Sequence, residues 1–161
     1  MNLRALVDKA INNIQKGTGY LGHGNDGTIY AVDEKVILKL HNGGYHGCPQ
    51  KSAEHEFALG TELYQQGVQV PEYLGLFGPV SIGRIDWSGV FMERIYGLDS
   101  SILPPTLIQE AQRQFQAQKK LIDKLGYIMS SDSKRGYSHN TLFDSEQGKL
   151  FLFDLVQWKR K

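Results

Sequence analysis

The feature that most constrains the fold is one acidic residue on the apolar side of a predicted helix. Residues 52–66 have helical spacing and end at Gly67, a residue that often stops a helix. One stripe of this helix collects mostly apolar or small residues: Ala53, Glu56, Phe57, Gly60, Leu63 and Tyr64. A carboxylate on a buried face is costly unless a cation meets it, whereas Glu54 lies off the stripe and is expected to face solvent.

Lys39 is the natural partner of Glu56. It closes the apolar run Val36–Lys39, which is expected to form a strand before the helix. Taken alone, a lysine in such a run indicates an edge-strand charge that reaches solvent. The acidic residue on the helix favours the other interpretation, in which strand and helix pack together through a Lys39–Glu56 ion pair.

The rest of the chain alternates between short strands and helices. A first amphipathic helix is predicted over residues 2–16, and a capping-box pattern at Thr106–Gln109 is predicted to open a helix that runs to Leu125. Asp33 and Glu34 are expected to form a tight turn. The predicted strands cover residues 19–23, 28–33, 35–40, 72–77, 89–95, 141–143 and 150–153. This order predicts an α+β fold with a strand-rich first half.

Glycines recur between the first two predicted strands. The segment GHGNDGTIYAV places Gly22, Gly24 and Gly27 where a backbone without Cβ atoms lets phosphate oxygens approach closely. The same spacing occurs in dinucleotide-binding turns, but those lead into a helix, whereas Thr28–Val32 has the alternation of a strand. The segment therefore favours a hairpin that covers phosphates, with an ordinary glycine-rich hairpin as the alternative.

Taken in order, these motifs resemble the protein-kinase-like superfamily. Residues 56–71 (EFALGTELYQQGVQVP) look like the helix and following turn of RIO-type atypical kinases, and residues 90–97 (VFMERIYG) look like the strand and hinge that hold adenine. Residues 140–144 (NTLFD) and 149–154 (KLFLFD) resemble the strand pair that carries the metal-binding asparagine and aspartate. The resemblance covers residues 19–156 and rests on the order of motifs that are each weak alone.

The resemblance implies a bilobal kinase-like fold and an ATP- and Mg²⁺-dependent phosphotransferase. Residues 1–161 would form a single domain of this kind. An N-terminal helix would occupy residues 1–18, an N-lobe with its hinge strand residues 19–95, and a strongly reduced C-lobe residues 96–161.

The resemblance also assigns roles to single residues. The glycine turn would cover the ATP phosphates, and Lys39, oriented by Glu56, would neutralise them. Asn140 and Asp154 would hold Mg²⁺ against phosphate oxygens, although each taken alone indicates only a turn residue and a strand-end carboxylate. The residues that would contact adenine are a gatekeeper and two hinge positions: Met92, Glu93 and Ile95.

The catalytic base is assigned to Asp132. The spacing that the family keeps between this base and the metal asparagine, counted back from Asn140, leads to Arg135, which cannot act as a base. The segment GYIMSSD instead matches the usual lead-in after a helix and gives Asp132 in a longer loop. The alternatives are that His139 takes this role or that the chain has no base.

Only seven residues follow Asp154 in the sequence, so the expected kinase has no activation segment. This architecture resembles the minimal kinases that bacterial pathogens inject into host cells, such as the HopBF type, which phosphorylates a heat-shock chaperone. The expected function is that of a minimal protein serine/threonine kinase with a protein substrate, a chaperone among the candidates. The first alternative is an inactive pseudokinase that binds nucleotide or protein, and the second is a small-molecule kinase.

Composition sets the outer limits of these expectations. The 161 residues carry 18 basic and 17 acidic side chains, and a net charge of +1 gives no general attraction to nucleic acid or anionic membranes. The single cysteine, Cys48, fits a reducing compartment, and no apolar run is long enough to cross a membrane. We expect a cytoplasmic protein, or an effector secreted into a host cytosol, with neither nucleic acid nor a membrane as partner.

No standard zinc pattern matches the spacing of His41, His46, Cys48 and His55.

Overall fold

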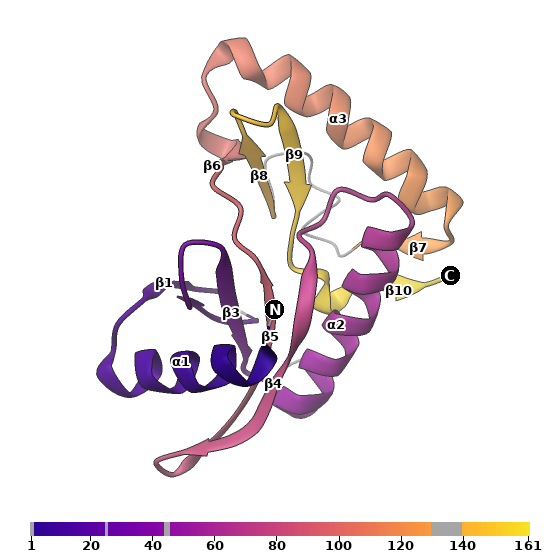
Figure 1. Ribbon diagram of the computed structural model, residues 1–161. Helices are drawn as coiled ribbons and strands as arrows, with labels where there is room; N and C mark the ends of the chain where they lie inside the picture. The colour runs from indigo at the N-terminus through magenta and orange to yellow at the C-terminus, as the bar shows by residue number, and fades with distance from the viewer. Residues whose placement is uncertain (1, 25, 44–45, 130–139) are drawn as a thin grey trace. The chain divides into compact units, whose positions relative to one another are not determined.

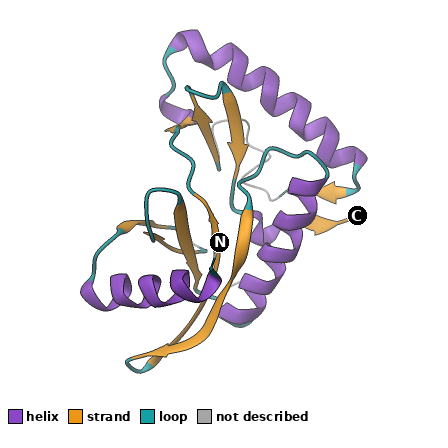
Figure 2. Cartoon of the chain, in the orientation of Figure 1, coloured by secondary structure: helices purple, strands orange, loops and turns teal. Residues whose placement is uncertain are grey.

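The computed structural model describes residues 2–24, 26–43, 46–129 and 140–161 (Figure 1). Helices and antiparallel strands alternate along the chain, which gives a mixed α+β structure, as the sequence predicts (Figure 2). The chain divides into two compact units, each of which is described by itself. The first contains Met1–Thr61 and Glu72–Arg94, and the second contains Glu62–Pro71 and Ile95–Lys161.

The segment Glu62–Pro71 groups with the second unit, although its neighbours on both sides along the chain belong to the first. Its backbone gives the reason, because the Gln69 carbonyl accepts a hydrogen bond from the Leu152 N–H at 2.8 Å. The boundary expected from the sequence, after residue 95, lies next to the junction of the two units at Arg94 and Ile95.

A five-stranded antiparallel sheet forms the body of the first unit, with its strands in the order β1, β2, β3, β5, β4. Turns rich in glycine and acidic residues separate runs of β-branched, aromatic and aliphatic residues, the composition that fits a pleated surface. The bounds are Tyr20–His23 for β1, Gly27–Ala31 for β2, Val36–His41 for β3, Tyr73–Ile82 for β4 and Ile85–Glu93 for β5.

Helix α1 (Leu3–Lys16) has a signal at each end. The Asn2 side chain accepts hydrogen bonds from the N–H groups of Arg4 and Ala5, at 3.1 and 3.4 Å. Gly17, with φ of 64°, takes the left-handed conformation that commonly ends a helix. The helix therefore begins and ends close to the predicted bounds.

The two faces of the sheet carry different side chains. Leu38 and Leu40 of β3 are buried in an apolar core that they share with helix α1, which lies along this face (Figure 1). Because side chains alternate along a strand, Lys39 and His41 lie on the opposite face. Helix α2 (Pro49–Gln65) packs there, through contacts described below.

Helix α2 begins earlier than predicted, because Pro49 is well suited to a first helical turn. Its buried face includes Glu56, and Glu54 is exposed, both as predicted. Tyr64 is 46% exposed, whereas Leu59 is 6% exposed. The predicted stripe is thus wrong at Tyr64 and omits Leu59, because the helix is rotated slightly from the orientation that the apolar spacing indicated.

A long hairpin of β4 and β5 replaces the two shorter strands predicted in this region. Gly78 and Pro79 were expected to interrupt the pairing. A register shift between Phe77 and Val80 absorbs them, and pairing continues until Ile82 lies opposite Ile85. Gly78 is required at this bulge, because its φ is 86° and an added Cβ would collide with the Trp87 carbonyl oxygen.

The second unit combines one long helix with two small antiparallel sheets, in the orders β6, β8, β9 and β10, β7. The β8–β9 hairpin was predicted, whereas β6, β7 and β10 are too short to leave a clear sequence pattern. The bounds are Leu98–Asp99 for β6, Pro105–Lys124 for α3, Tyr127–Ile128 for β7, Thr141–Asp144 for β8, Lys149–Leu152 for β9 and Lys159–Arg160 for β10.

Helix α3 starts without the capping box that the sequence predicts. Pro104 is the N-cap residue and makes no side-chain capping bond, and Pro105 occupies the first helical position. Proline suits this position because its missing N–H would have no partner there. Thr106 therefore lies inside the helix, and the capping-box prediction is wrong. Gly126, with φ of 80°, follows the helix and ends it as predicted.

Two glutamines of α3, which the sequence analysis did not single out, satisfy backbone groups of the second unit. Gln114 is 9% exposed, accepts a hydrogen bond from the Leu150 N–H at 2.9 Å and donates one to the Gly148 carbonyl at 2.7 Å. Gln118, one helical turn later, accepts from the Gln69 N–H at 2.8 Å. These side chains join the helix to β9 and to the segment that leads away from α2.

The last residues of the chain are held by the second unit. From the sequence alone, residues 159–161 are expected to form a solvated basic tail behind a packed Trp158. Trp158 is fully buried as expected, but the backbone that follows is not a free tail, because β10 pairs with β7 and sets Lys159 opposite Ile128. The Arg160 side chain pairs with Glu62 and lies 5.4 Å from the centroid of the Tyr127 ring. Among the described helices, none has both the length and the apolar composition needed to span a membrane.

Candidate functional site

The centre of the candidate site is a buried ion pair in the first unit. The Lys39 Nζ atom of β3 lies 2.8 Å from the Glu56 Oε2 atom of α2. Lys39 is 7% exposed and Glu56 is 1% exposed, so both charges are removed from water. The predicted contact between the strand lysine and the helix glutamate is confirmed.

Two more side chains reach the same carboxylate. The His41 Nε2 atom lies 3.2 Å from Glu56 Oε2, and the Tyr73 hydroxyl donates a hydrogen bond of 3.1 Å to Glu56 Oε1. Both residues are buried. Neither role was predicted from the sequence. The signal for His41 is its position two residues after Lys39, which places both side chains on one face of β3.

These contacts determine the charge of Glu56. Burial alone would raise the pKa of its carboxyl group, but the positive charge of Lys39 and the contact with His41 lower the pKa to about 2. Glu56 is therefore ionised at neutral pH. The result is a fixed negative charge that holds the lysine amine in one place.

The three glycines of the turn between β1 and β2 are not equivalent. An added Cβ at Gly27 would collide with the Leu40 carbonyl oxygen, so packing against β3 requires glycine there. Added Cβ atoms at Gly22 and Gly24 would have no neighbour within 4 Å, and neither residue has a positive φ. The fold itself therefore does not require glycine at these two positions.

Gly22 belongs to the face of the sheet that carries Lys39. The strand register sets Gly22 opposite Ile29 and Ile29 opposite Lys39. Residues directly opposite each other on antiparallel strands share a face of the sheet. A side chain at position 22 would thus project on the same face as the lysine, where the glycine leaves space.

The residues expected to contact adenine lie at the end of β5 and just after it. Met92 is 3% exposed and sits opposite Ile37 and Tyr73 in the sheet. The Glu93 N–H donates to the Glu72 carbonyl at 2.9 Å, so its hydrogen-bonding capacity serves the sheet. The Glu93 carbonyl and the Ile95 amide take no part in that bond.

The predicted metal ligands lie together in the second unit. Asn140 immediately precedes β8 and Asp154 follows β9, and the Asn140 carbonyl accepts a hydrogen bond of 2.9 Å from the Phe153 N–H. Both residues have left-handed backbones, with φ of 52° and 62°. Such conformations are uncommon outside glycine and cluster at functional sites. The two side chains therefore start from one end of the same hairpin.

The remaining candidates fall outside what the structure describes. Asp132, the predicted base, and His139, its alternative, lie outside the described residues.

In the described ranges, no group of three or more histidine, cysteine, aspartate or glutamate side chains could hold a metal ion. His46 and His55 do meet, with ring centroids 4.4 Å apart.

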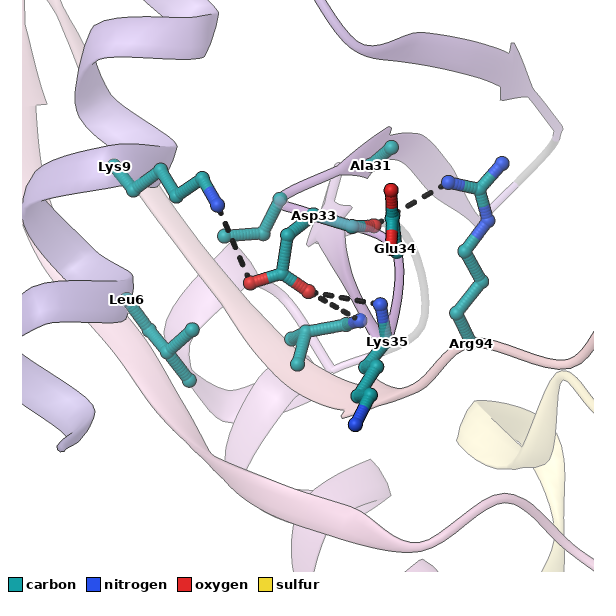
Figure 3. A pocket seen from close by; sticks show the side chains of 9 residues that line it. Leu6, Lys9, Ala31, Asp33, Glu34, Lys35 and Arg94 are labelled. Carbon is teal, nitrogen blue, oxygen red and sulfur yellow. Dashed lines mark hydrogen bonds and ion pairs between the residues drawn. The ribbon is translucent and has the colours of Figure 1, made fainter. Parts of the chain in front are cut away.

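A cavity of about 720 Å³ lies beside the turn between β2 and β3 (Figure 3). The Asp33 carboxylate accepts hydrogen bonds from Lys9 Nζ at 3.3 Å and from the Lys35 N–H at 2.9 Å. Partial burial raises the pKa of Asp33, but the bonds from Lys35 and Lys9 hold it below its usual value. These bonds close the turn, and none of the residues expected to act on a nucleotide lines the cavity.

No protein-family model and no curated protein matches this chain.

Proposed function

We propose that this protein is an ATP- and Mg²⁺-dependent phosphotransferase that acts on serine or threonine hydroxyls of a protein. The observation that carries the proposal is the buried Lys39–Glu56 pair. Apolar side chains of similar size often stabilise a fold as well as a buried ion pair does, so the pair favours a role beyond stability. A lysine held by a helix carboxylate is the device with which kinases neutralise nucleotide phosphates.

The glycine turn supports the same interpretation. Gly22 and Gly24 are glycine where packing does not demand it, and Gly22 leaves open the face that carries Lys39. A phosphate group needs this kind of access to backbone N–H groups and to a cation. We therefore assign the open space to the phosphates of ATP.

Asn140 and Asp154 are the proposed ligands of Mg²⁺. Both carry oxygen donors, which Mg²⁺ prefers, and both extend from one end of the β8–β9 hairpin. Protein sites for Mg²⁺ usually supply one or two carboxylates and leave the other positions to phosphates and water, so this donor set fits the ion. The ion would neutralise charge that develops on the phosphate oxygens.

The chemistry proposed for the chain's own residues is simple. Lys39 holds the nucleotide phosphates, and Asp132 accepts the proton of the attacking hydroxyl. As the new oxygen–phosphorus bond forms, the bond from the γ-phosphorus to the bridging oxygen breaks and ADP leaves. Met92, Glu93 and Ile95 are the proposed contacts of the adenine ring.

The test uses the purified full chain with labelled ATP, Mg²⁺ and a lysate as a source of acceptor proteins. Lys39→Met and Asp154→Asn are each expected to lower transfer by about 100-fold or more, because each removes a charge that faces the phosphates. Asp132→Asn is expected to lower transfer by about 100-fold or more while leaving ATP binding intact. Matched controls are Lys35→Met and Asp8→Asn, which change exposed residues of the same types.

The outcomes separate the proposal from its alternatives. A protein that ATP stabilises against heat but that transfers no phosphate in any form would be a nucleotide-binding pseudokinase. Transfer that survives Asp154→Asn would remove the metal assignment, and transfer that survives Asp132→Asn would remove the base. A chain that neither binds ATP nor transfers phosphate would overturn the proposal.

A further inference from the structure

The Glu56 carboxylate has more partners than an ion pair with one lysine needs. Lys39 Nζ and His41 Nε2 approach the same oxygen, at 2.8 and 3.2 Å, and the Tyr73 hydroxyl bonds to the other oxygen at 3.1 Å. Lys39 and His41 come from β3, and Tyr73 comes from β4. Helix α2 is thus tied through one side chain to two strands of the sheet.

The imidazole of His41 is unusual because its burial is costly. The side chain is 0% exposed, and in the part of the chain that the structure describes neither ring nitrogen makes a hydrogen bond of good geometry. The Nε2 atom approaches the carboxylate oxygen at 3.2 Å, a close polar contact rather than a well-aligned hydrogen bond. An apolar side chain would avoid that cost, so the contact with Glu56 is the reason that the structure gives for a histidine.

Tyr73 fixes the helix in a second way. Gly60 lies one helical turn after Glu56, and an added Cβ there would collide with the Tyr73 ring. The ring therefore packs directly on the backbone of α2 while its hydroxyl holds the carboxylate. The packing at Gly60 and the hydrogen bond to Glu56 together hold one turn of α2 against β4.

We propose that His41 and Tyr73 are positioning residues that keep Glu56, and with it helix α2, docked on the sheet without the help of Lys39. This inference deepens the proposed function, on which its meaning for catalysis rests. A lysine that binds a phosphate must share or give up its contact with the carboxylate. With the Tyr73 hydroxyl bonded to it and the His41 ring beside it, the carboxylate keeps polar partners and the helix does not move when the lysine turns to its ligand.

The test measures backbone amide exchange in α2, relative to exchange in α1 of the same molecule, without nucleotide. Lys39→Met is expected to raise this ratio less than the double variant His41→Leu/Tyr73→Phe, which is expected to raise it by more than about tenfold. His41→Gln, which retains an N–H donor, should restore the ratio in part where His41→Leu does not. Glu54→Gln, an exposed change on the same helix, is the control.

Two results would overturn the proposal. One is an increase in α2 exchange after Lys39→Met as large as that of the double variant, which would make the lysine the anchor. The other is an unchanged α2 after the double change. If the double variant does not fold, Tyr73→Phe and His41→Leu are measured singly, and each must raise the ratio more than Lys39→Met does. Because no nucleotide is present, a chain that fails to transfer phosphate can still pass this test, and an active enzyme can fail it.

Discussion

Replacing Glu56 by glutamine should destabilise the protein strongly at neutral pH and weakly at low pH. Glutamine has the same shape, but its neutral amide cannot compensate the buried Lys39 charge. Its NH₂ group would also face the Lys39 and Tyr73 donors, where the carboxylate offers an acceptor. The pKa of Glu56 falls from 4.5 to about 2 on folding. This shift corresponds to about 3 kcal/mol at pH 7, in line with about 3–5 kcal/mol for removing one partner of a buried pair.

The sign of the pH dependence follows from the lowered pKa. A carboxylate with a depressed folded pKa contributes its full stability above the unfolded pKa of 4.5 and loses it as the pH falls toward 2. The difference in unfolding free energy between the natural chain and Glu56→Gln should therefore be nearly constant from pH 7 to pH 5. It should shrink by roughly half near pH 3.3, because the carboxyl group is protonated there in the unfolded state while it is still ionised in the folded state.

Urea unfolding at several pH values measures this difference directly. The control is Glu54→Gln, which lies two residues away on the exposed side of the same helix and should change stability by less than about 0.5 kcal/mol. A difference below about 1 kcal/mol for Glu56→Gln at pH 7, or one that does not decline on acidification, would refute the electrostatic account of the site.

Two further changes test how the fold supports the site and the second unit. Gln114→Leu should lower the unfolding free energy by about 2–3 kcal/mol, because it removes the acceptor of the buried Leu150 N–H. Gln112→Leu, a change at an exposed position of the same helix, is the control. Equal effects of the two changes would contradict this role of Gln114. Gly60→Ala should destabilise by about 1–3 kcal/mol, since its Cβ would collide with the Tyr73 ring. A melting temperature that rises with Gly60→Ala would show that this close approach is absent.

The sequence was most informative where a polar residue broke an apolar pattern. Glu56 stands out on its helix, and its need for a cation points to Lys39, which the structure confirms. The turn at Asp33 and the helix end at Gly126 could also be predicted, because an aspartate side chain closes the turn and a left-handed backbone favours glycine after the helix. Energetic costs of this kind can be recognised from the amino-acid sequence alone.

Other features depend on contacts that no local pattern encodes. Tyr73 reads as an ordinary strand residue, and only the packing of β4 against α2 brings its hydroxyl to Glu56. Gln114 reads as a surface residue of an amphipathic helix, yet it satisfies the backbone of β9. The β4–β5 hairpin was underestimated because Gly78 signals a break, whereas a bulge lets the pairing continue.

Two groups of buried polar side chains differ in what they contact, and the difference directs attention to the site. Asp144 and Gln114 bond to backbone groups, so the turn and the strand edge would be left unsatisfied without them. Glu56, Lys39 and His41 instead meet one another, side chain to side chain, on a face of the sheet. Apolar residues that replace a buried ion pair often cause no loss of stability. A cluster that the backbone does not need favours a role beyond stability, and the proposed function supplies one, because it sets the phosphates of a nucleotide against Lys39.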